Sequence, residues 1–155
     1  MITYRPALPD DTASIVSLLA ELMQEHGVAP PEDERLAETV AIVGACPNHL
    51  LLVAEAVGTI IGNTIVGMCT LAFSCNTWST APICELQDVI VTATYRRRRV
   101  GRGLIETAEN IARDRGCSRL FLTVESWNLD AHGFYRSLNL AEKTCLYFER
   151  DLHST

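Results

Sequence analysis

The sequence predicts one mixed α/β domain over residues 1–155, with a mostly antiparallel central sheet and one parallel β-α-β pair. Three segments have apolar residues at helical spacing, and strand-like β-branched runs lie between them. Three strand-like runs follow one another in mid-chain, which favours antiparallel pairing. Strand and helix alternate in the last third, which favours a parallel pair. The expected order is therefore β-α-α-β-β-β-α-β-α-β(-β).

The first third of the chain predicts a short strand over residues 2–5 and then two helices. Asp10 and Asp11 can cap the first helix, and the proline and acids of residues 30–34 are typical of the start of the second. Residues 44–47 end the second helix. The apolar stripes are Ile15, Leu18, Leu19 and Leu22 in the first helix and Leu36, Val40 and Val43 in the second.

The middle of the chain predicts three strands, over residues 49–57, 65–73 and 84–91, with a turn over residues 58–64 between the first two. A helix over residues 101–115 follows. Its apolar face consists of Leu104, Ile105, Ala108, Ile111 and Ala112.

At the end of the chain, strand-like and helix-like segments alternate. Residues 120–124 are almost wholly apolar, as expected of a central strand that is covered on both faces. Residues 128–138 predict a short helix, and residues 141–152 predict one or two last strands.

The bulk composition is that of a soluble globular protein. The 155 residues suffice for one domain, and 48% apolar with 21% charged residues excludes a disordered chain. The net charge of −6 disfavours nucleic-acid binding and mildly favours cationic or basic partners. No apolar leader and no apolar run of membrane length is present, so a membrane partner is not expected.

The cysteines predict a cytoplasmic, reducing setting and no metal site. They form no C-x-x-C pair and have no histidine spacing that is typical of zinc, so reduced, buried thiols are expected. The six are Cys46, Cys69, Cys75, Cys84, Cys117 and Cys145.

The most informative segment joins the strand that ends at residue 91 to the next helix. It reads Val91-Thr92-Ala93-Thr94-Tyr95-Arg96-Arg97-Arg98-Arg99-Val100-Gly101-Arg102-Gly103. A helix N-terminus has unpaired N–H groups and partial positive charge, glycines allow a ligand close to the backbone, and arginines add charge. The segment is therefore suited to a pyrophosphate. A solvated basic turn is the alternative interpretation, and neither a P-loop nor a complete G-x-G-x-x-G motif fits.

This segment resembles the acetyl-CoA-binding motif of the GNAT N-acyltransferase family, Gln/Arg-x-x-Gly-x-Gly/Ala. In the favoured register the motif positions are Arg96, Arg99 and Gly101. In the other register they are Arg98, Gly101 and Gly103. The favoured register puts Arg99 where the family usually has glycine, so its side chain must point away from the cofactor or reach a phosphate. The resemblance implies that acetyl-CoA or coenzyme A is bound by Val89, Val91, Arg96, Arg97, Arg98, Arg99, Val100, Gly101, Arg102, Gly103, Asn128 and Tyr135.

A second segment resembles the family's signature Asn-x-x-Ala-x-x-Phe-Tyr-x-x-Leu-Gly-Phe. The matching residues are Asn128, Ala131, Phe134, Tyr135 and Leu138. Asn128 is placed to cap its helix, and Asn139, which replaces the glycine, tolerates the left-handed backbone of a helix stop. By resemblance, Asn128 approaches the pantetheine arm and Tyr135 is the general acid that protonates the departing thiolate. His132 takes a variable family position and is not expected to act in catalysis.

The resemblance implies an N-acetyltransferase that moves an acetyl group from acetyl-CoA to a primary amine by direct attack in a ternary complex. An amine is protonated at pH 7, so a base must remove a proton. Side chains alternate along a strand, so one face is expected to carry Glu85, Gln87, Val89 and Val91. Asp88 is expected on the opposite face. In the favoured register Glu85 takes the position of a catalytic glutamate, and Glu125, a water relay or the substrate itself are alternatives.

Several alternatives stay open at this point. A non-catalytic coenzyme A-binding domain of the same fold would share both motifs, whereas nucleic-acid binding through the arginines is disfavoured by the acidic charge. In the family the acceptor site is shaped by the first two helices and nearby loops, here residues 22–38 and 74–82. Trp78 and the apolar tail could support a homodimer. The sequence does not identify the acceptor amine.

Overall fold

The computed structural model describes residues 1–59 and 62–152, and it divides the chain into two compact units, Met1–Leu122 and Thr123–Thr155. The first unit contains the sheet and three of the helices, and the second contains one helix and the C-terminal tail. Residues 60–61, in the predicted turn, lie outside the described residues.

Five strands of the first unit form one sheet in the order β1-β2-β3-β4-β5. The strands are β1 (Ile2–Pro6), β2 (His49–Thr59), β3 (Gly62–Cys75), β4 (Pro82–Val91) and β5 (Arg119–Phe121). The first four pair antiparallel in succession, and β5 pairs parallel with β4. The predicted mixed, mostly antiparallel sheet is confirmed.

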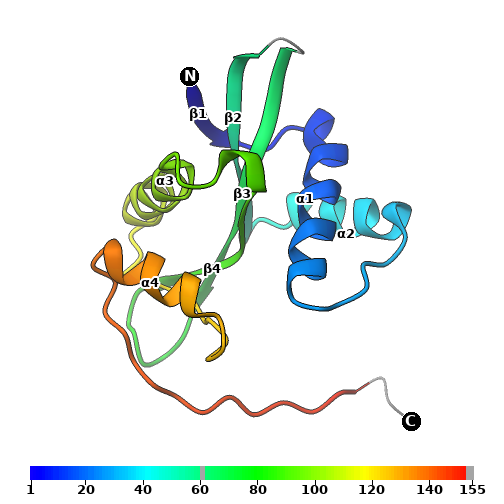
Figure 1. Cartoon of the computed structure of the whole chain (residues 1–155). Coiled ribbons are helices and arrows are strands. Elements are labelled where there is room, and N and C mark those ends of the chain that lie inside the picture. Colours follow the sequence, from blue (N-terminus) through cyan, green and yellow to red (C-terminus); the bar gives the residue numbers. More distant parts are fainter. Residues whose placement is uncertain (60–61, 153–155) are drawn as a thin grey trace. The chain divides into compact units, whose positions relative to one another are not determined.

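The helices form where the apolar stripes predicted them, within a few residues at each end. They are α1 (Thr12–Glu25), α2 (Asp33–Ala45), α3 (Val100–Asp114) and α4 (Leu129–Ser137). In the first unit, α1 and α2 lie on one face of the sheet and α3 lies on the other (Figure 1). Among the described residues, no helix has the length and apolar character that crossing a membrane requires.

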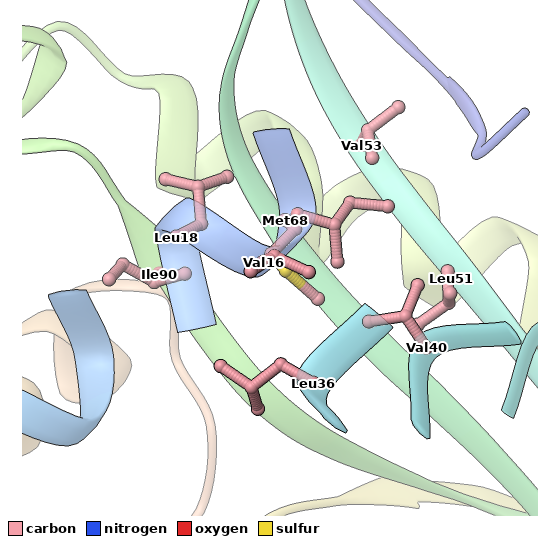
Figure 2. Close-up of a cluster of buried hydrophobic side chains, with 9 residues drawn as sticks. Val16, Leu18, Leu36, Val40, Leu51, Val53, Met68 and Ile90 are labelled. Atoms are coloured by element: carbon pink, nitrogen blue, oxygen red, sulfur yellow. The ribbon is translucent and has the colours of Figure 1, made fainter. Parts of the chain in front are cut away.

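The core beneath α1 and α2 consists of the predicted helix stripes and the facing side chains of three strands (Figure 2). Its buried members are Ile15, Val16, Leu18, Leu36, Val40, Leu51, Val53, Met68 and Ile90. On the other face, the stripe of α3 buries Leu104, Ile105, Ala108 and Ala112, each at most 3% exposed. Burial of such side chains contributes roughly 1.5–3 kcal/mol each, so these faces fix both helix layers on the sheet.

Three predictions about the elements are wrong. β5 spans three residues and is only half-buried, where a fully covered strand over residues 120–124 was predicted. Residues 141–152 form no strand, because strand propensity produces a strand only when a neighbouring chain supplies the ladder of hydrogen bonds. Asp11 makes no side-chain cap on α1. Its carboxylate instead accepts the Leu8 N–H at 2.7 Å and binds Arg5.

Candidate functional site

The basic turn between β4 and α3 has a backbone that is unusual for arginine. A short 3-10 turn, Ala93–Tyr95, follows β4, and α3 begins at Val100. Arg97 and Arg99 both have left-handed backbones, with φ of 61° and 65°. Arg99 directly precedes Val100, the first right-handed residue of α3, and such a pair turns successive N–H groups toward one point, an arrangement that binds anions. The first turn of α3 adds its own unpaired N–H groups, so the predicted phosphate site has a donor-rich backbone.

Arg96 is directed to α1. Its Nη2 forms ion pairs with Glu21, at 3.3 Å, and with Glu25, and its Nε donates to the carbonyl of Val91 at 2.7 Å. Glu21 also accepts the N–H of Ala93 at 3.2 Å. The side chain at the first motif position thus ties the basic turn to α1 and to the end of β4, with its charge already compensated.

The other arginines have different surroundings. Arg98 lies over the ring of Tyr95, at 5.3 Å from its centroid, and Arg102 forms an ion pair with Glu106 at 3.7 Å. Within the described part of the chain, Arg97 and Arg99 have no acidic partner. Arg98 has no acidic partner among the described residues either, so the charges of all three guanidinium groups are available to a phosphate.

Gly103 supports the packing of α3, a role that motif reasoning did not identify. A Cβ at this position would lie 2.1 Å from Oη and 2.2 Å from Cζ of Tyr4, on β1. The ring of Tyr4 therefore occupies the space that a side chain would need. The long sequence separation of the two residues hid this contact from the sequence.

A β-bulge in β4 overturns the predicted faces of that strand. Thr70 pairs with Gln87 and Met68 pairs with Ile90, so two residues of β4, Asp88 and Val89, oppose one residue of β3. Because Thr70 and Met68 share a face, Gln87 and Ile90 share it too. The expectation that the four odd-numbered residues share one face is therefore wrong: Glu85 and Gln87 lie on the α1/α2 side, and Val91, which pairs with Gly67, does not.

The expected position of Asp88 is also wrong. Its backbone is left-handed, with φ of 51°, and its Oδ2 accepts a hydrogen bond from the hydroxyl of Thr70 at 3.2 Å. The carboxylate is therefore directed to the face of Thr70, which Gln87 shares. A left-handed residue is rare in a strand, and only the pairing with β3 reveals where the alternation breaks.

Glu85 and Cys84, which are neighbours on β4, differ in their surroundings and reactivity. Glu85 is half-buried and accepts a hydrogen bond from Nε2 of Gln87 at 3.1 Å. Cys84 faces the other side of the sheet and is fully buried. Burial raises the pKa of the Cys84 thiol to about 11. A protonated, buried thiol is a poor nucleophile, which disfavours an acyl-cysteine intermediate.

The second unit contains the Asn-x-x-Ala-x-x-Phe-Tyr segment on α4. Oδ1 of Asn128 accepts the N–H of Ala131 at 3.2 Å, which confirms the predicted cap. Asn139 has a φ of 61°, which confirms the left-handed helix stop. The rings of Tyr135 and Phe134 lie 5.0 Å apart, and Nε2 of His132 lies 3.0 Å from the carbonyl of Glu125.

No cluster of three or more potential metal ligands occurs within residues 1–59 and 62–152. The donors that the site does offer, backbone N–H groups and guanidinium groups, suit phosphate oxygens.

Arg99 provides a test of the backbone of the basic turn. Arg99→Gly and Arg99→Ala both remove the guanidinium, but only glycine adopts a φ near 65° without strain. We expect the glycine variant to be more stable than the alanine variant by about 1 kcal/mol in urea denaturation. Equal stabilities would show that the left-handed conformation is not maintained in solution.

Known proteins are similar to this chain in sequence and in fold. The family model described as the acetyltransferase (GNAT) family matches residues 15–139. The thialysine N-epsilon-acetyltransferase of Bos taurus is 31% identical over 166 residues, covering 96% of this chain and 92% of its own. The Mus musculus protein of the same name is 29% identical, covering 90% of this chain and 84% of its own.

Solved structures share the fold at lower identity. A possible acetyltransferase from Clostridium difficile 630 superposes with a TM-score of 0.84 at 22% identity, covering 99% of both chains. Glucosamine-6-phosphate N-acetyltransferase from Arabidopsis thaliana superposes with a TM-score of 0.78 at 15% identity, covering 97% of this chain and 98% of its own.

Proposed function

The chain belongs to the acetyltransferase (GNAT) family, and from this premise we propose that it transfers an acetyl group from acetyl-CoA to a primary amine by direct attack in a ternary complex. The observation that carries the proposal is the turn between β4 and α3, where two left-handed arginines precede a helix N-terminus. Its donors suit the pyrophosphate of coenzyme A.

The cofactor-binding roles belong to this proposal. The N–H groups at the start of α3, together with Arg97 and Arg99, bind the pyrophosphate, while Arg96 keeps the turn on α1. By family resemblance, the backbone of Val89 and Val91 pairs with the pantetheine arm and polarises the thioester carbonyl, which places the reaction centre beside Val89. Bound acetyl-CoA supplies an acetyl group that is activated as a thioester, whose thiol is a fair leaving group with a pKa near ~8.5.

The chemical roles are proposed for two side chains. Tyr135 protonates the departing thiolate, and Glu85, which is directed to the α1/α2 side of β4, receives the proton of the amine through water. Glu85 precedes Val89 by four residues, at most roughly 13 Å of strand, so a water is assigned to carry the proton between an amine beside Val89 and Glu85.

The acceptor class rests on two observations. The bovine and murine relatives are named for the epsilon nitrogen of thialysine, a primary amine, and the net charge of −6 favours cationic acceptors. The proposal also includes a single domain over residues 1–155, a cytoplasmic location and a homodimer. The cytoplasm is a reducing compartment, which agrees with the six free cysteines.

Acetyl-CoA is expected to stabilise the protein against heat. At about 100 times its dissociation constant the ligand adds about 2.7 kcal/mol, which raises the melting temperature by about 5–10 °C for a domain of this size. ATP, which lacks the pantetheine arm, should give little shift. No shift with either acetyl-CoA or coenzyme A would refute the proposed cofactor.

Turnover is then measured as thiol release with thialysine, lysine and other primary amines. Tyr135→Phe is expected to lower kcat modestly, because the thiol leaves readily without an acid. A protein that binds acetyl-CoA but releases no thiol with any amine would be a coenzyme A-binding domain.

A further inference from the structure

The β-bulge in β4 places a carboxylate beside the backbone that is proposed to hold the thioester. Asp88 immediately precedes Val89, and both lie where β4 departs from regular pairing with β3. The left-handed backbone of Asp88, with φ of 51°, is of a kind that costs about 1 kcal/mol or more for a residue other than glycine. The pairing on either side of the bulge holds the residue in this conformation.

The surroundings of Asp88 leave its negative charge uncompensated. Its hydrogen-bond partner is the neutral hydroxyl of Thr70, which is 3% exposed, and no cationic side chain of the described residues pairs with it. Desolvation raises the pKa of the Asp88 carboxyl, and the Thr70 bond opposes this rise in part. Asp88 nevertheless remains accessible to solvent. The two properties are compatible, because part of the residue can be touched by water while many protein atoms lie around its carboxylate.

A carboxylate with these properties is suited to receive a proton from an ammonium group. An incoming cation would compensate its charge, and in poorly hydrated surroundings the neutral pair of amine and carboxylic acid becomes more favourable relative to the ion pair. Glu85 lies on the same side of β4 but farther from Val89 along the strand. Asp88 is therefore the nearer of the two carboxylates to the proposed reaction centre.

We propose that Asp88 binds the ammonium group of the acceptor and takes its proton before attack on the thioester. This proposal rests on the proposed function, in which Asp88 then takes the place of Glu85 as the base. One N–H bond breaks and one carboxyl O–H bond forms. The freed nitrogen lone pair then forms the C–N bond to the acetyl carbon as the C–S bond breaks, and the electron pair leaves with the sulfur, which takes a proton from Tyr135. The nitrogen releases its second proton to water as the amide forms, and Tyr135 regains a proton from water. Asp88 returns its proton to water after the amide has formed.

Asp88→Asn tests the role with little change of shape, because asparagine keeps the size, accepts the Thr70 hydrogen bond and tolerates a left-handed backbone. With thialysine, a strongly basic amine, we expect kcat/KM to fall by about 100-fold or more. With an acyl hydrazide, whose nucleophilic nitrogen is already neutral at pH 7, the fall should be at least tenfold smaller. This difference isolates proton removal from a general loss of structure.

Asp88→Gly is a second variant, which removes the carboxylate and relieves the strain of the left-handed backbone. Its fall in kcat/KM should again be larger with thialysine than with the acyl hydrazide. Asp114→Asn, at the exposed end of α3, is the matched control and should retain wild-type kinetics with both amines. Glu85→Gln tests the competing base.

The role of Asp88 is wrong if its variants lose similar activity with both amines, keep their activity, or are less impaired with thialysine than Glu85→Gln. Failure of the proposed function has a different signature. In that case the wild-type protein itself releases no thiol with either amine.

Discussion

Replacement of Gly103 by alanine is expected to lower the free energy of unfolding by about 3 kcal/mol, near the upper end of the range for overpacking. Alanine would normally stabilise a helix interior by about 1 kcal/mol over glycine, so the predicted sign is the opposite of what helix propensity gives. The cause is Tyr4, whose Oη and ring atoms lie 2.1–2.6 Å from the position of the new Cβ. Urea denaturation measures the change.

A double-mutant cycle identifies the contact. With Tyr4→Leu, the ring and its hydroxyl are removed, and Gly103→Ala should then cost much less than in the wild-type background. Gly44→Ala is the matched control, because the new Cβ in α2 meets only Leu51 Cδ1 at an ordinary 3.7 Å. Equal costs of Gly103→Ala with and without Tyr4 would contradict the proposed clash.

Replacement of Arg5 by leucine is expected to lower the free energy of unfolding by about 2 kcal/mol at pH 7, because Asp11 would then be buried without its partner. This loss is smaller than that for a fully buried ion pair, because Arg5 is partly hydrated in the folded protein. Arg5 holds both oxygens of Asp11, at 2.7 and 3.1 Å, and both oxygens of Glu55, at 3.2 and 3.1 Å. The side chain of Asp11 is 10% exposed.

The effect should depend on pH with a definite sign. Hydrogen bonds from Arg5 lower the pKa of Asp11 and of Glu55 in the folded protein. These two groups therefore contribute stability that is present above their unfolded pKa values, about 4, and is lost as the pH falls through the lower folded values. The difference between wild type and Arg5→Leu should shrink between about pH 4 and pH 2.

Arg113→Leu serves as the control for this second prediction. Its ion pair with Glu109, at 2.8 Å, is exposed, with 66% of the Arg113 side chain accessible, and such pairs contribute little. We expect a small change that does not depend on pH in this range. If Arg5→Leu behaved like this control, the Arg5 network would not contribute to stability.

Local patterns predicted much of the fold and part of the site. The apolar stripes of α1, α2 and α3 give helices whose buried faces match the pattern, because helical periodicity depends on neighbours three and four residues away. The cap by Asn128 and the left-handed stop at Asn139 were predictable for the same reason. Motif spacing also located the basic turn at the start of α3.

The sequence by itself thus determined the order of the elements up to α4, the identity of the helix faces and the place where β4 is followed by a basic helix start, since all of these depend on residues close together in the chain. Only the tertiary structure decided that Arg96 binds Glu21 and Glu25, that Gly103 makes room for Tyr4, and that the bulge at Asp88 moves a carboxylate to the other face of β4. The physical reason is that each of these depends on a partner from a distant segment, which sets the available space, the compensating charge and the pairing register.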